Sequence, residues 1–256
     1  MSALVTWGDA YLGTVGPFVV SEPWWSQVEP VVTHLREVLD VPVFVLRLLT
    51  VQGGEGGRDG HVTYHAAALE RPPAGLERPA AGLERPAAGS ERPLAGLPNP
   101  GPAGLAALTG PEDLRLPWAR IEGLHEVLTW ASDTLRTAGR PLTGPAEQYR
   151  TWNLSALFRL PTEQGLVWLK TTPPFAADEA SVIAAFARVD PALVPSVIGA
   201  APGRVLLDHL PGEAWTSRRP GCDPARALAV AEPLAHLAYA VRYQEFLDGI
   251  EPSAPP

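Results

Sequence analysis

The chain has 256 residues, of which 46% are hydrophobic, and carries a formal net charge of -8. This length suffices for one large core or two small ones, and the scarcity of clustered Lys and Arg argues against a nucleic-acid-binding face. A single cysteine, Cys222, excludes an intrachain disulfide; with neither a signal-peptide pattern nor an apolar run of transmembrane length, a cytoplasmic protein without membrane contact is expected.

Residues 1–68 are expected to form a small N-terminal β-α-β-β unit. Aliphatic and β-branched runs at 15–20, 41–51 and 61–67 predict three strands, and the glycine-rich turn between the last two predicts a hairpin. A helix is predicted over 26–39 because its apolar residues recur at helical spacing, at Val28, Val31, Val32, Leu35 and Leu39.

A low-complexity segment follows at 69–104. The heptad Leu/Ser-Glu-Arg-Pro-x-Ala-Gly occurs four times, starting at Leu69, Leu76, Leu83 and Ser90. A seven-residue period is typical of coiled coils, but a proline in every heptad prevents a continuous helix. We therefore expect an exposed Pro/Gly-rich linker over 69–109. A proline-dependent binding site is the alternative.

The segment 110–145 is expected to hold one amphipathic helix, over about 117–138. Gly139 and Pro141 end the helical pattern. Such a helix needs a partner surface for its apolar face, which consists of Ile121, Leu124, Leu128, Ala131 and Leu135.

Residues 146–213 alternate strand-like runs with one helix. The predicted strands are 152–160, 167–171, 194–198 and 205–209, and the predicted helix is 178–188. The C-terminal segment, 214–256, is predicted to contain two helices, 224–231 and 234–248. These elements together predict an α+β fold.

The strand-like run Val167-Trp-Leu-Lys170 ends in a lysine, and Glu179 follows in the first turn of the predicted helix. Phosphoryl transfer depends on positioning and on neutralising charge, and a strand lysine held by a helix glutamate provides both. The alternative is a solvated lysine at a strand end and an acid that interacts only with the helix dipole.

The wider sequence resembles the aminoglycoside phosphotransferase-like family, which has a kinase fold. Four stretches carry the resemblance, in the order of that family's nucleotide loop, strand lysine, helix glutamate and hinge: Trp152-Asn-Leu-Ser-Ala-Leu-Phe-Arg-Leu160, Val167-Trp-Leu-Lys-Thr-Thr-Pro-Pro-Phe175, Asp178-Glu-Ala180 and Leu206-Leu-Asp-His-Leu-Pro-Gly-Glu213. Residues 1–68 and the helix in 110–140 resemble the amino-terminal extension of a subgroup of the family.

The resemblance implies ATP and Mg²⁺ as cofactors and a kinase-like small lobe at 146–213. In that lobe Lys170 is expected to bind phosphate, Glu179 to hold Lys170, and Ser155 to act as a donor of the phosphate loop. The backbone of His209 and Leu210 is expected to contact adenine.

The chain departs from the family where the large lobe should supply the chemistry. No His-x-Asp sequence occurs, and only nine residues separate Glu213 from Asp223. We therefore expect no catalytic residue and no metal site, and predict an inactive phosphotransferase-like protein that binds nucleotide weakly. One alternative is an active enzyme that recruits Asp248 or Glu245. The other is a non-enzymatic interaction module carried by residues 1–68. Separately, the underside of a small lobe without its large lobe is expected to be exposed, which allows a protein partner or self-association through that surface.

Two histidines, His61 and His65, lie on one face of a predicted strand. A metal site needs a third convergent ligand, and the spacing supplies none. Packing or surface histidines are therefore expected there.

Overall fold

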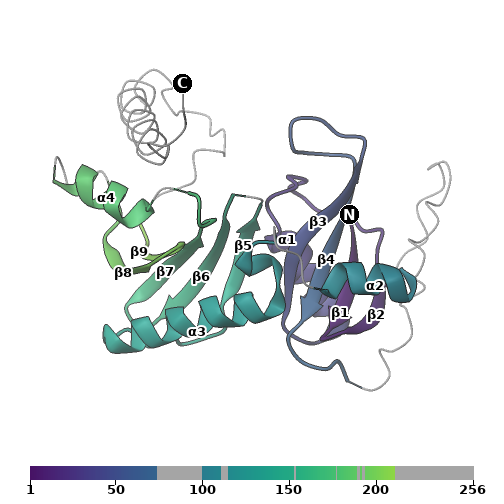
Figure 1. Cartoon of the computed structure of the whole chain (residues 1–256), viewed down its shortest axis with the longest axis horizontal. Helices are drawn as coiled ribbons and strands as arrows, with labels where there is room; N and C mark the ends of the chain where they lie inside the picture. Colours follow the sequence, from purple (N-terminus) through teal and green to yellow (C-terminus); the bar gives the residue numbers. More distant parts are fainter. Residues whose placement is uncertain are drawn as a thin grey trace, which may run out of the picture.

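The protein has an α+β fold with two β-sheets lying side by side (Figure 1). The computed structural model describes residues 1–73, 100–110, 115–152, 154–176, 178–188, 191 and 194–210. The four-stranded first sheet is mixed, and the five-stranded second sheet is antiparallel throughout.

Two antiparallel hairpins joined by a helix form the first sheet. Its strand order is β2-β1-β4-β3, and β1 runs parallel to β4 where the two hairpins meet. The elements are β1 (Ser2–Trp7), β2 (Ala10–Val15), α1 (Glu29–Leu39), β3 (Val43–Gln52) and β4 (His61–Ala68).

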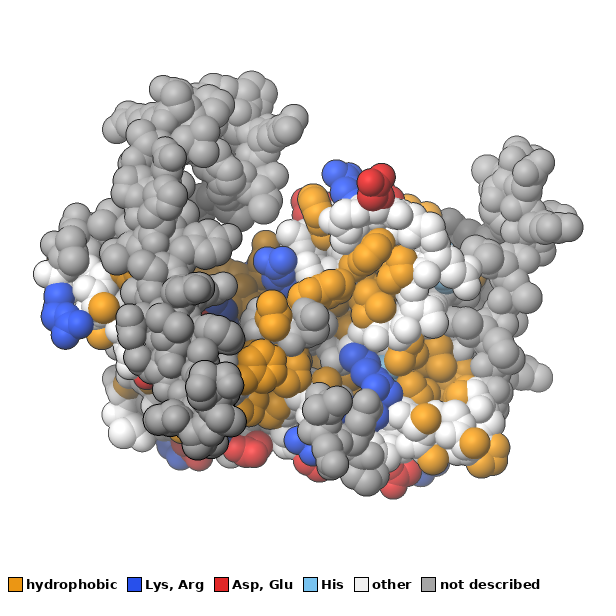
Figure 2. Space-filling model, turned by 45° about the horizontal axis from the view of Figure 1, so that its top comes forward, with side chains coloured by type: hydrophobic (Ala, Val, Ile, Leu, Met, Phe, Trp, Pro, Cys, Tyr) orange, Lys and Arg blue, Asp and Glu red, His pale blue; other side chains and the backbone are white. Residues whose placement is uncertain are grey.

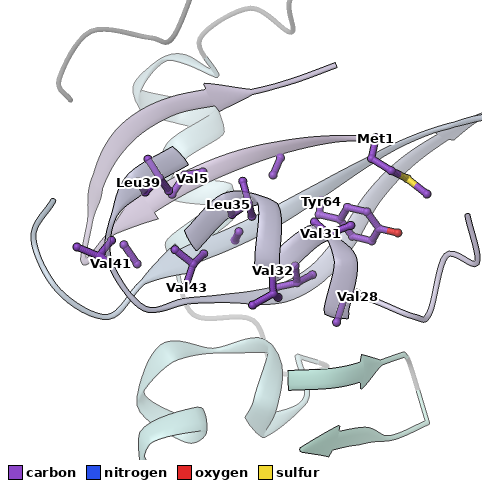
Figure 3. Close-up of a cluster of buried hydrophobic side chains, with 14 of the residues drawn as sticks. Met1, Val5, Val28, Val31, Val32, Leu35, Leu39, Val41, Val43 and Tyr64 are labelled. Carbon is purple, nitrogen blue, oxygen red and sulfur yellow. The ribbon is translucent and has the colours of Figure 1, made fainter. Parts of the chain in front are cut away.

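The helix α1 packs its apolar face on one side of this sheet. The spacing of its valines and leucines places them in one stripe, and this stripe meets alternate residues of the strands (Figure 3). Asp40 ends the helix in the left-handed conformation, with φ 53°, and its N–H donates a hydrogen bond to Arg36 O. The predicted helix and the predicted β3–β4 hairpin are confirmed.

The start of the chain differs from the prediction. No strand spans 15–20. Instead, residues before Val15 form two strands that were not expected from the sequence, β1 and β2, and β2 ends at Val15. The chain leaves the sheet at Gly16, whose φ is +121°, and Pro17 has no N–H to donate to a neighbouring strand. The expected β-α-β-β unit is therefore a ββαββ unit.

The second sheet has the strand order β5-β6-β7-β9-β8, with α4 (Glu179–Ala187) connecting β7 to β8. Helix α3 (Ile121–Thr137) packs on one face, against Phe158, Leu169 and Leu206, whereas α4 packs on the opposite face. The strands are β5 (Glu147–Thr151), β6 (Ala156–Thr162), β7 (Gly165–Thr171), β8 (Val197–Ala201) and β9 (Arg204–Asp208).

Several element bounds in this half differ from the predictions. The predicted strand at 152–160 starts only at Ala156, because 147–151 forms a separate strand, β5, that pairs with it. The strand predicted at 194–198 lies at 197–201. A short helix, α2 (Gly101–Thr109), lies in the segment expected to be a linker, and a 3₁₀ turn, η1 (Pro117–Ala119), precedes α3. The predicted helices at 224–231 and 234–248 fall outside the described residues.

A buried glutamine joins the two sheets. The side-chain amide of Gln148, on β5, donates to Val45 O at 2.7 Å and accepts from Val45 N at 2.8 Å. Gln148 is 2% exposed. The amide therefore pairs with the outer edge of β3 as a neighbouring strand would, and beside it Phe44 and Leu46 pack in the same core as Phe158 and α3.

None of the helices within the described ranges is both long and apolar enough to span a bilayer.

Replacing Gln148 by Ala should destabilise the fold by about 2–4 kcal/mol, because it leaves the N–H and C=O of Val45 buried without partners. Urea unfolding gives this free energy directly. Gln164→Ala is the matched control: its side-chain amide donates to Gly139 O on the surface, so its effect should stay below about 0.5 kcal/mol. Equal effects for the two variants would contradict the structural role given to Gln148.

Candidate functional site

Lys170 and Glu179 form an ion pair at the C-terminal end of β7. The Lys170 ammonium lies 2.7 Å from Oε1 of Glu179 and 2.6 Å from Oε2. Their side chains are 32% and 26% exposed, respectively. The structure thus brings these two predicted residues together, with the ammonium group held at a fixed position but still within reach of solvent.

The start of α4 fixes the glutamate. Asp178 caps the helix, because its carboxylate accepts from the N–H of Ala180 at 3.2 Å. Glu179 is the first helical residue, and its carboxylate also lies at the positive end of the helix dipole. The cap and the ion pair therefore together hold the Glu179 side chain facing Lys170.

A cavity of about 540 Å³ lies beside this pair. Its wall includes Lys170, Asp178 and Glu179, together with the loop after β7 and the β8–β9 turn. Gly203 in that turn has φ +70°, and a Cβ there would lie 2.9 Å from Thr172 O. A glycine therefore lets the β8–β9 turn approach the loop that forms one side of the cavity.

Lys170 is the only lysine in the chain, so nineteen of the twenty basic residues are arginines. The two side chains differ chemically, because lysine presents a compact ammonium and arginine a planar, forked guanidinium. Lys170 is therefore the one side-chain ammonium group in this sequence.

The other predicted site residues do not line the cavity beside Lys170. Ser155 lies in the turn just before β6, whose residue Leu157 is paired with Lys170. His209 lies just beyond the end of β9, where Trp168 Nε1 donates to its Nδ1 at 3.0 Å. It is four positions along the chain from Val205, the partner of Lys170, a span of roughly 13 Å. Leu210, the next residue, is 50% exposed.

One further residue of the face that bears Lys170, Arg159, was not predicted from the sequence. Arg159 forms a bidentate ion pair with Glu29 at the start of α1, and its guanidinium lies 4.5 Å from the ring centroid of Tyr149 and 5.5 Å from that of Trp168. Alternation along β6 could have placed Arg159 on this face, since it lies two residues from Leu157, the partner of Lys170. The ion-pair partner of Arg159, Glu29, lies 130 residues away, and no local pattern indicates the pairing.

The acids considered as substitutes for the missing catalytic residue, Asp248 and Glu245, lie outside the described residues. Within the described part, no three His, Cys, Asp or Glu side chains come together as a metal site would require.

The histidines on β4 take separate hydroxyl partners from β1. His61 Nε2 lies 3.1 Å from Ser2 Oγ, and His65 Nε2 lies 2.9 Å from Thr6 Oγ1. His65 is 2% exposed. Its burial, with the charges of Arg47 and Arg115 nearby, lowers its pKa to about 4. In the folded protein His65 is thus a neutral packing residue.

Comparisons of the chain with protein-family models, with curated proteins and with solved structures gave no match.

The buried His65 should make the stability depend on pH. Its pKa is about 4 in the folded state and about 6.5 in the unfolded state. The unfolded chain therefore binds the extra proton between these values, and stability falls as pH decreases through this range. Between pH 7 and pH 5 His65 should contribute a loss of about 2 kcal/mol.

Urea unfolding of His65→Gln at the two pH values should show that this loss has disappeared. The exposed His125→Gln variant should keep it. If His65→Gln lost stability with decreasing pH as the wild type does, another group would be responsible.

Proposed function

We propose that the lobe formed by residues 146–210 binds the phosphate groups of a nucleotide at Lys170, and that this chain by itself does not transfer phosphate. It would thus be a cytoplasmic relative of the aminoglycoside phosphotransferase-like proteins that keeps the small-lobe half of an ATP site. Weak binding is expected.

The Lys170–Glu179 pair is the observation that carries this proposal. β7 is the third strand of its sheet in chain order, α4 is the helix that follows, and the sheet is antiparallel. A lysine on the third strand and a glutamate on the next helix form the ion pair that positions ATP phosphates in kinases. The cavity beside the pair gives phosphate groups a place to lie.

The residues present fit a phosphate better than they fit Mg²⁺. The ammonium of Lys170 is directed by two carboxylate contacts, whereas the described residues include no group of three metal-binding side chains. Across the whole sequence no His-x-Asp occurs. Without an acid and metal ions, the charge that develops on a transferring phosphoryl group is not neutralised, which favours binding without transfer.

The same lobe also exposes apolar side chains, among them Leu154 at 58% and Phe175 at 77%. Exposed residues of this kind are compatible with a protein partner or with self-association, which is a further part of the proposal.

A unique lysine allows a direct test. An amine-acetylating reagent can modify only Lys170 and the α-amino group, and bound ATP should slow acetylation of Lys170 alone. Peptide mass spectrometry follows both sites in one experiment. Adenosine, which has no phosphate, should give no protection, because the proposal places the phosphates, and not the base, at Lys170.

Thermal unfolding supplies the second readout, because a ligand of the native state raises the melting temperature. The increase with ATP should vanish in Lys170→Ala and persist in Arg188→Ala, which removes an exposed cation from the same lobe. Equal protection by adenosine, or no protection at saturating ATP, would refute phosphate binding. ATP turnover that disappears in Lys170→Ala would refute the absence of transfer.

A further inference from the structure

A second cavity, of about 340 Å³, lies where the first sheet, the segment around η1 and the β5–β6 turn meet. Four aromatic residues contribute to its wall: Trp25, Tyr64, Trp118 and Trp152. They come from four segments that are far apart in the sequence: the loop before α1, β4, η1 and the β5–β6 turn. Ligand cavities occur preferentially at such junctions, lined by aromatic side chains with few polar groups.

The polar atoms of three of these aromatic residues bond to backbone carbonyls. Tyr64 Oη donates to Trp25 O at 2.9 Å, Trp25 Nε1 donates to Asp59 O at 2.8 Å, and Trp118 Nε1 donates to Trp152 O at 3.3 Å. These bonds fix the orientation of the three rings. The rings therefore expose mainly apolar surface to the cavity, and their orientation is fixed before a ligand binds.

The charged residues along the wall are Arg47 and Arg115. The carbonyl of Ala107, near the end of α2, accepts from both guanidinium groups at 3.0 Å, which fixes them in position. Planar guanidinium groups stack on aromatic rings. On the face shown in Figure 2, Lys and Arg side chains likewise lie next to hydrophobic ones.

We propose that this cavity binds a flat aromatic molecule of one or two rings. The fixed indole, phenol and guanidinium groups all favour contact with a π-system, and the volume lies at the lower end of the range for ligand cavities. Trp152 is 37% exposed, and its partial exposure places it at the entrance. This proposal is independent of nucleotide binding at Lys170.

Two small probes with the same carbon skeleton test the proposal. 2-Naphthol is flat and aromatic, whereas decahydro-2-naphthol is its saturated counterpart, and both are uncharged at neutral pH. Isothermal titration and saturation-transfer NMR on the full chain should show binding of 2-naphthol at least about tenfold tighter than that of decahydro-2-naphthol. Equal affinities, or no binding of 2-naphthol, would overturn the proposal.

The chain offers a matched pair of tryptophans to locate the site. Trp152 lines the cavity and Trp24 does not, yet their exposures are nearly equal, 37% and 38%. Trp152→Leu should weaken 2-naphthol binding about tenfold, and Trp24→Leu should leave it unchanged. The same loss in both variants would place the binding elsewhere.

A second variant keeps the test valid if Trp152→Leu weakens binding only because it folds poorly. Leu116→Trp adds bulk to the cavity from the opposite segment and should abolish 2-naphthol binding while the melting temperature stays near that of the wild type. A well-folded Leu116→Trp protein that still binds 2-naphthol with wild-type affinity would exclude this cavity as the site.

Discussion

The pairing of the Gln148 amide with the backbone of Val45 is the contact on which the rest of the structure depends. β3 is the outer strand of the first sheet, and an outer strand presents N–H and C=O groups that need partners once they are buried. A further strand paired with β3 would extend the first sheet. One side-chain amide instead supplies hydrogen-bond partners to the N–H and C=O of a single residue, so β5 need not continue alongside β3. Two separate sheets can therefore meet along β3 with a continuous apolar core between them and α3.

This junction also determines which face of the second sheet packs against α3 and which faces α4. Gln148 points into the shared core, and strand alternation sends its neighbours Glu147 and Tyr149 to the opposite face. The register carries this alternation across β6 to β7, so Leu169 is buried against α3 while the side chain of Lys170, on the other face, is 32% exposed. Arg159 reinforces the arrangement from the Lys170 face by its ion pair with Glu29. The position of Lys170 thus depends on a contact made 22 residues earlier in the chain.

Local sequence patterns predicted the parts of the fold that depend on local contacts. Helices α1 and α3 were found from their apolar spacing, and the Lys170–Glu179 pair from a strand followed closely by a helix. β5 was missed because Glu147 and Arg150 make it polar, and its buried Gln148 has its partner 103 residues away. β1 was missed for a similar reason: it pairs in parallel with β4, about 60 residues later. The aromatic residues of the second cavity come from four segments, and no local pattern brings them together.

Trp118 contributes to the walls of both cavities. Its indole Nε1 donates to Trp152 O at 3.3 Å, and Trp152 lines the aromatic cavity. The turn is held a second time where Trp152 N donates to Ser155 O at 2.8 Å. A ligand that moved Trp152 would thus act on Trp118, and the effect of one site on the other would be reciprocal in free energy. Trp118 opposes such movement, because it is 2% exposed and packs in the core that the second sheet shares with α3.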